Sequence, residues 1–122
     1  MARTPIKILI CGSRNLPTTV ADIDAAREEE GWFEDVELII CGDCPTGADK
    51  AAIDWAREYG CDASCHVAGW EKHGKSAGPI RNQAMIDMAP DMVFAFWDGK
   101  SAGTLMTLQI AERMGKPFEI RT

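Results

Sequence analysis

Short apolar runs alternate with amphipathic segments along the whole chain. The apolar runs have the length of strands and cover residues 6–11, 36–41, 62–67, 91–97 and 117–120. The segments between them carry apolar residues at helical spacing, which predicts helices over residues 19–30, 47–59, 78–88 and 103–115. Strands that alternate with helices predict an α/β fold, in which a mostly parallel five-strand sheet has helices on both faces in a three-layer α/β/α arrangement.

Two of the runs, KILIC and ELIIC, are apolar at nearly every position instead of alternating with polar residues. This pattern is typical of parallel strands that are buried on both faces. We therefore expect the strands over residues 6–11 and 36–41 to be central in the sheet.

The predicted helix over residues 47–59 has a clear apolar face, made of Ala48, Ala51, Ala52, Trp55 and Tyr59. We expect this face to pack on the sheet and Gly60 to end the helix in a left-handed conformation. The stripe in segment 19–30 is thinner and includes Val20 and Ile23. The acidic residues of that segment are expected to face water: Asp22, Asp24, Glu28, Glu29 and Glu30.

The chain has 122 residues, of which 46% are hydrophobic, and it contains no repeat or linker-like segment. This predicts a single domain over residues 1–122. The apolar runs are too short to cross a membrane, and the first residues do not resemble a secretion signal. We therefore expect a cytoplasmic protein without a membrane partner.

The net charge of −6 comes from 19 acidic and 13 basic residues and repels a phosphate backbone. Broad nucleic-acid binding is therefore disfavoured, whereas a local pocket for a small anionic ligand remains compatible with the composition.

Five cysteines are an odd number and do not predict a disulfide framework. Cys41 and Cys44 form a C-x-x-C motif, and Cys61 and Cys65 follow with His66 nearby. A structural zinc site is the alternative, but the second pair lacks the tight spacing of a zinc knuckle. We expect reduced thiols in the core and predict no metal and no cofactor.

The loops that follow the strands carry the candidate chemistry, because ligands of open parallel sheets bind at the carboxyl ends of the strands. The first loop offers Gly12, Ser13 and Arg14, where the alternative is a Gly-Ser turn with a surface arginine. The second loop offers Gly42, Gly47 and Asp49. There Thr46 and Asp49 are also explained as helix-capping residues, without any ligand.

The third and fourth loops complete the set. Trp70 lies in a long connection and either closes a pocket or simply packs. Arg81 and Asn82 fall in the first predicted turn of segment 78–88, where a basic residue is unfavourable unless an anion is near. The fourth loop places small and hydroxyl residues at a helix start, which suits phosphate binding, and offers Asp98, Ser101, Gly103 and Thr104. Together the four loops favour an anion-binding cradle.

The order of these motifs resembles the YspA-like branch of the SLOG superfamily, which includes the Lonely Guy enzymes and DprA. The motifs are Gly-Ser-Arg, Gly-x4-Gly-Ala-Asp, Ala-Gly-x-Ile-Arg-Asn-x-x-Met and Asp-Gly-x-Ser-x-Gly-Thr, and they span almost the whole chain. The resemblance implies a Rossmann-like sheet that binds a nucleotide or a nucleotide-derived ligand, often in a homodimer. Carried onto this chain, the family's binding motif corresponds to Gly12, Ser13, Arg14, Gly47, Asp49, Arg81, Asn82, Ser101, Gly103 and Thr104.

Two functions follow from this resemblance. The first is a module that senses or sequesters a nucleotide-derived molecule. The alternative is an N-glycosidic phosphoribohydrolase of the Lonely Guy type. Those enzymes carry a Glu three residues after their Gly-Thr pair, whereas this chain has Thr107 there. An enzyme would therefore need another carboxylate, from Asp98, Asp49 or Glu71, and we identify no catalytic residue.

We also predict a homodimer built on helix faces that carry Met85, Met88 and Met114, because these apolar side chains exceed what one sheet is expected to cover.

Overall fold

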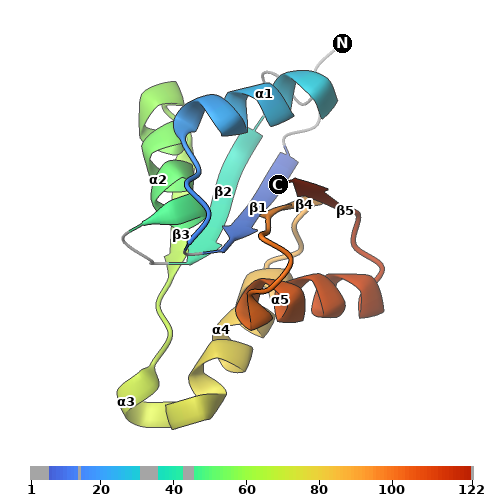
Figure 1. Ribbon diagram of the computed structural model, residues 1–122. Helices are drawn as coiled ribbons and strands as arrows, with labels where there is room; N and C mark the ends of the chain where they lie inside the picture. The colour runs from blue at the N-terminus through green and yellow to red at the C-terminus, as the bar shows by residue number, and fades with distance from the viewer. Residues whose placement is uncertain (1–5, 14, 31–35, 43–45, 122) are drawn as a thin grey trace.

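The structure is a computed structural model that describes residues 6–13, 15–30, 36–42 and 46–121 (Figure 1). Its strands form one sheet with the spatial order β3-β2-β1-β4-β5, in which every neighbouring pair is parallel. The strands are β1 (Ile6–Gly12), β2 (Val36–Gly42), β3 (Asp62–His66), β4 (Met92–Phe96) and β5 (Phe118–Arg121). The predicted α/β fold is confirmed, and β1 and β2 lie inside the sheet as expected, each with a strand on either side.

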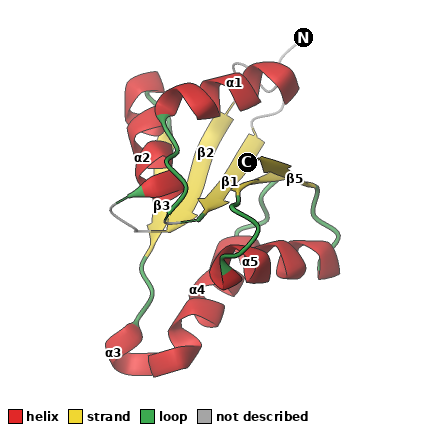
Figure 2. Cartoon of the chain, in the orientation of Figure 1, coloured by secondary structure: helices red, strands yellow, loops and turns green. Residues whose placement is uncertain are grey.

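Helices cover both faces of the sheet (Figure 2). One face carries α1 (Val20–Glu30) and α2 (Gly47–Tyr59), and the other carries α4 (Ala77–Asp87) and α5 (Ala102–Arg113). Between β3 and α4, a short helix α3 (Trp70–His73) runs into a 3₁₀ turn, η1 (Gly74–Ser76). This stretch is a loop in the sequence-based prediction, because four residues are too few to show a helical repeat of apolar positions.

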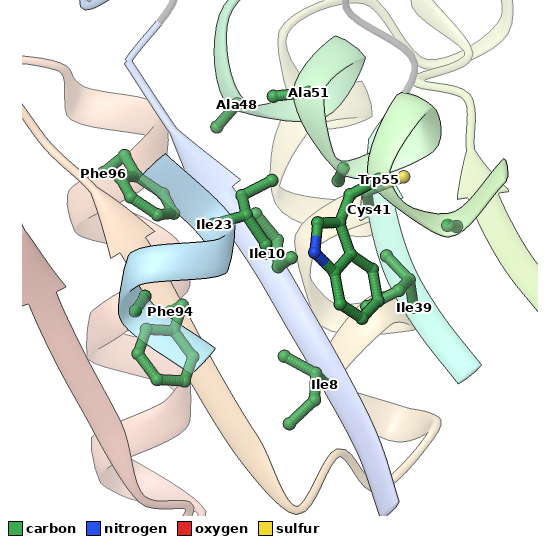
Figure 3. Packing of buried hydrophobic residues seen from close by; sticks show 13 residues of the cluster. Ile8, Ile10, Ile23, Ile39, Cys41, Ala48, Ala51, Trp55, Phe94 and Phe96 are labelled. Carbon is green, nitrogen blue, oxygen red and sulfur yellow. The ribbon is translucent and has the colours of Figure 1, made fainter. Parts of the chain in front are cut away.

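Alternate residues of β1 enter two separate cores, which is why the whole strand is apolar. Ile8 and Ile10 pack with Ile23 of α1 and Trp55 of α2, as Figure 3 shows. Leu9 and Cys11 belong to the second core, beneath α4 and α5. Successive side chains of a strand point to opposite faces, so a strand covered on both sides has few places for a polar residue.

The contact between α1 and α2 corrects one expectation. Asp24 does not simply face water: its carboxylate accepts a hydrogen bond from Trp55 Nε1 at 2.9 Å and one from Tyr59 Oη at 2.7 Å. The Arg27 guanidinium lies over both rings, 4.9 Å from the centre of the Tyr59 ring. Tyr59 is therefore part of a polar clasp at the rim and keeps 44% of its surface exposed, rather than packing on the sheet. Gly60 ends α2 with φ of 71°, as predicted.

The methionines proposed for a dimer face lie in different environments. Met85 is buried in the core beneath α4 and α5, and Met88 is half-buried with its sulfur near Ser64 and His66. Met85 is therefore not available to a dimer face, which corrects that part of the prediction, whereas Met88 is covered only in part. Met114 is exposed, and the homodimer itself stays a prediction.

Across the residues described, none of the helices has the length and apolar character needed to span a membrane.

Candidate functional site

A cavity of about 470 Å³ lies at the carboxyl ends of β1 and β2. Its lining comes from the two strand ends, from the beginning of α2, from α3 and α4, and from the first turns of α5. Pockets of about 300–1,000 Å³ hold small organic ligands in proteins. The cavity therefore lies where an open parallel sheet is expected to bind a ligand, and it has a suitable size.

Gly42, at the end of β2, allows two charged side chains to meet over the strand. A Cβ atom at this position would lie 2.5 Å from Arg81 Nη1 and 2.7 Å from Asp49 Oδ2. The Gly42 N–H also donates to Asp49 Oδ1 at 3.3 Å. The guanidinium of α4 and the carboxylate of α2 therefore share a space that any larger residue would occupy.

A chain of hydrogen bonds connects this charged pair to the beginning of α5. Arg81 Nε donates to Asn82 Oδ1 at 2.9 Å, and Asn82 Nδ2 donates to the Gly103 carbonyl at 3.4 Å. Arg81 Nη1 also reaches the carbonyl of His66 at 3.5 Å. Because α4 begins at Ala77, Arg81 is past its first turn, so the argument from an unfavourable first-turn position does not apply. The carbonyl partners explain its location instead.

The beginning of α5 is open toward the cavity. Ser101, in extended conformation, precedes the helix, and Thr104 Oγ1 lies 3.4 Å from Ser101 Oγ. A Cβ atom at Gly103 would meet no atom within 4 Å. The first amides of a helix have no acceptor within the helix, and they carry the positive end of its dipole. This end of α5 therefore offers N–H groups to an anion.

Asp98 and Ser13 hold this loop through hydrogen bonds and are not among the lining residues. Asp98 Oδ1 accepts hydrogen bonds from the N–H groups of Lys100 at 2.8 Å and Ser101 at 2.9 Å, and these bonds lower the pKa of the carboxyl. The buried Ser13 hydroxyl accepts from the Asp98 N–H at 3.0 Å. Both were expected to touch a ligand, but in the structure their polar atoms join the loops after β1 and β4.

Two other glycines of the predicted site, Gly12 and Gly47, are required by packing and by backbone conformation, respectively. A Cβ atom on Gly12 would lie 2.6 Å from Ala48 Cβ and 2.7 Å from the Phe96 carbonyl, so close packing of β1, β4 and α2 excludes a side chain there. Gly12 also lines the cavity. Gly47 opens α2 with φ of 70°, a left-handed conformation that favours glycine, and does not line the cavity.

Trp70 stands at the outer rim. It lines the cavity, 59% of its surface is exposed, and its ring approaches Gly78 at the beginning of α4. Arg14 lies outside the described residues. The structure thus brings most of the predicted residues around one cavity: Gly12, Gly42, Asp49, Trp70, Arg81, Asn82, Ser101, Gly103 and Thr104.

Three apolar residues of the lining, Cys11, Met85 and Met106, are not among the predicted site residues and form the floor of the cavity. Burial raises the pKa of the Cys11 thiol to about 12, with a smaller contribution from the charge of Asp49, so this floor is uncharged. Helical spacing was the available signal, because Met85 follows Arg81 by one turn. The buried Thr107 likewise follows Gly103 by one turn and donates to its carbonyl at 3.3 Å.

The carboxylates and thiols considered as catalytic or metal-binding groups lie in different places. Of the three candidate carboxylates, Asp49 lines the cavity, whereas Asp98 and Glu71 do not. In the portion of the chain that the structure covers, no three His, Cys, Asp or Glu side chains are grouped closely enough to hold a metal ion. Cys65 and His66 are neighbours in β3 and therefore point to opposite faces, with His66 Nε2 directed at Met88 Sδ 2.9 Å away.

Comparison with known proteins identifies the family. The family model described as YspA, cpYpsA-related SLOG family matches residues 6–73, from β1 to the end of α3. The chain is also 36% identical over 118 residues to the Gene 61 protein of Mycobacterium phage D29, an alignment that covers 91% of this chain and 92% of that relative. These matches confirm the resemblance that the loop motifs indicated. The chain belongs to the YspA, cpYpsA-related SLOG family.

Proposed function

We propose that the protein binds a nucleotide or a nucleotide-derived small molecule in the cavity, and thereby senses or sequesters it. The observation that carries this proposal is the composition of the lining. It combines the open beginning of a helix, the guanidinium of Arg81, an apolar floor and an exposed tryptophan at the rim. These features are complementary to a ligand that has a charged phosphate and a flat aromatic base.

The phosphate is assigned to the beginning of α5. N–H groups at a helix start bind phosphate through hydrogen bonds and through the positive end of the dipole. Gly103 leaves room for close approach, and the Ser101 and Thr104 hydroxyls add further donors. Arg81 adds a positive charge to the lining beside the carboxylate of Asp49, and Asn82 connects its guanidinium to the Gly103 carbonyl at the start of α5. Binding of an anion is thus compatible with the overall charge of −6.

The aromatic part of the ligand is assigned to the apolar floor of the cavity and to Trp70. Met85 and Met106 present apolar surface on the floor, and the ring of Trp70 stands at the opening. Stacking of a base on an aromatic side chain contributes about 1–3 kcal/mol and tolerates different bases. The proposal therefore specifies a class of ligand rather than one base.

A calorimetric screen tests the proposal with adenine and guanine nucleotides, ADP-ribose and cyclic dinucleotides. We expect one of them to bind, and Arg81→Ala to weaken that binding by about 1.5–3 kcal/mol, the range for a hydrogen bond to a charged group. Arg57→Ala is the matched control, because Arg57 is exposed in the last turn of α2 and is not part of the lining. Circular dichroism checks that both variants keep the parent fold.

Two results would contradict the proposal: the absence of any ligand in the screen, or an Arg81→Ala variant that binds as tightly as the parent.

A phosphoribohydrolase activity is the second candidate, and the position of Asp49 favours it. Among the described residues, Asp49 is the one carboxylate of the lining, and it lies beside Arg81. A carboxylate is the group that hydrolysis of an N-glycosidic bond needs. Chromatography of a nucleotide incubated with the pure protein tests this activity: free base must accumulate, and Asp49→Asn must abolish it at saturating ligand. A nucleotide that survives unchanged leaves binding as the function.

A further inference from the structure

Two cysteines of neighbouring strands face each other beside the cavity. Cys41 of β2 and Cys65 of β3 are partners in the parallel register, so both side chains point to the same face of the sheet. Their Sγ atoms are 3.8 Å apart. From the sequence, these thiols are predicted to be core residues, with a metal cluster as the alternative. Neither the fold nor the proposed ligand requires the two thiols to be paired.

The backbone already permits a bond between the two sulfurs. Adjacent strands lie about 4.8 Å apart, and disulfides join Cα atoms separated by about 4.4–6.8 Å. A bond shortens the sulfur separation from 3.8 Å to about 2.05 Å. β3 is an edge strand with mostly exposed or half-buried residues, so it can take up this change while β2 stays fixed inside the sheet.

The two thiols differ in access, which sets their roles. Cys65 is exposed, whereas Cys41 is fully buried and lies beneath α2, near Trp55 (Figure 3). Burial raises the pKa of the Cys41 thiol, and the neighbouring Cys65 and Asp49 raise it further. An oxidant therefore meets Cys65 first. Cys41, whose thiolate form is rare, reacts second and slowly, with the mixed disulfide that forms next to it.

We propose that Cys41 and Cys65 are a redox-active pair that a low-molecular-weight disulfide oxidises to an intramolecular disulfide. The Cys65 thiolate attacks one sulfur of the reagent, forms a mixed disulfide and releases one thiolate. The Cys41 thiolate then attacks Cys65 Sγ and displaces the second reagent thiolate. Two protein thiols are oxidised, one reagent disulfide is reduced to two thiols, and the two protons pass to the released thiols.

The bond fastens the edge strand at the margin of the cavity. Cys41 precedes Gly42, and Cys65 precedes His66, whose carbonyl accepts from Arg81 Nη1. The formation of the bond is independent of whether the cavity binds a nucleotide, so a failure of either proposal leaves the other untouched.

Mass spectrometry of the full chain treated with oxidised glutathione tests the pair. Cleavage after Lys and Arg leaves Cys41 with Cys44 on one peptide and Cys61 with Cys65 on another, so the mapping uses the Cys44→Ser, Cys61→Ser double variant. We expect this variant to lose two hydrogen atoms in mass and to yield the two peptides as one crosslinked species, separated again by reduction. Adding Cys65→Ser must remove the crosslink, and this substitution at an exposed site is expected to preserve the fold.

A second measurement records the effect on the fold. Hydrogen exchange of the β3 amides is expected to slow in the oxidised double variant, because the bond fastens β3 to β2. The proposal is overturned if the double variant keeps all its thiols or carries only glutathione adducts. It is equally overturned if the crosslink forms but β3 exchanges faster than in the reduced protein.

Discussion

Gly42 is a residue at which one methyl group would displace charged side chains of the cavity. Arg81 Nη1 and Asp49 Oδ2 both occupy the space of its absent side chain, at 2.5 and 2.7 Å from the position of a Cβ atom. Real Cβ atoms do not approach other atoms so closely, so either the pair or the strand end must move. Gly103 is the opposite case, because its missing side chain would point into open space.

At this scale we predict that Gly42→Ala lowers the free energy of unfolding by about 1 kcal/mol, the low end of the cost of overpacking, because the ends of two flexible side chains must move aside. Urea denaturation monitored by tryptophan fluorescence measures the change. Gly103→Ala serves as control and is expected to retain or slightly raise the stability, since alanine is the better helix former. Equal stability of Gly42→Ala and the parent would show that Arg81 and Asp49 are not held over this strand end.

At the scale of elements, α1 is held in place by a cap at its N-terminus and by one polar contact with α2. Thr19 and Asp22 form a reciprocal cap: the Thr19 N–H donates to Asp22 Oδ2 at 2.8 Å, and the Asp22 N–H donates to Thr19 Oγ1 at 3.4 Å. One turn later, Asp24 receives hydrogen bonds from Trp55 and Tyr59 of α2. Partial burial alone would raise the pKa of Asp24, but these bonds and the charge of Arg27 outweigh it and lower the pKa.

Because the pKa of Asp24 is lowered, the stability that this contact contributes depends on pH. Asp24 binds its proton less readily in the folded chain than in the unfolded one, so its contribution is present at neutral pH and is lost as the pH falls through the folded pKa. We predict that Asp24→Asn costs about 1 kcal/mol at pH 7 and that the loss disappears in acid. Thermal unfolding between pH 7 and pH 3 measures both, with Glu28→Gln, an exposed change on the same helix, as control. A cost that is the same at every pH would contradict the assigned role of the carboxylate.

At the scale of the whole molecule, exposed apolar side chains indicate where a second copy would bind. Ile80 of α4 and Leu105 of α5 are exposed, and Met114, just after α5, contacts Gln83 of α4. β5, at the edge of the sheet, adds Phe118 and Ile120. Such side chains are often covered by association.

We therefore predict a homodimer through α4 and α5, in which the buried Met85 takes no part. Light scattering at micromolar concentration should give twice the mass of the chain, and Ile80→Glu should return it to the monomer. Val67→Glu is the control, because Val67 is 69% exposed and belongs to the segment after β3. A parent protein that is monomeric at that concentration would refute the prediction.

The sequence by itself determined the sheet and the edge of the sheet at which the cavity lies. Hydrophobic periodicity reports which side of each segment faces a core, and this was enough to predict five parallel strands, with β1 and β2 inside. Local backbone rules were equally sufficient for Gly60 at the end of α2. Because neighbouring parallel strands end on the same edge of the sheet, the strand ends at Gly12 and Gly42 and the loop that contains Ser101 were expected to lie close together.

Only the tertiary structure decided which side chains meet within that edge. The contact of Arg81 with Asp49 over Gly42, the clasp of Asp24 with Trp55 and Tyr59, and the pairing of Cys41 with Cys65 each join elements distant in the sequence. Such contacts depend on the register and crossing of the elements, about which the period of a single segment says nothing. The same physical reason explains why the Ser13 hydroxyl bonds to the Asp98 N–H of the loop after β4 instead of lining the cavity.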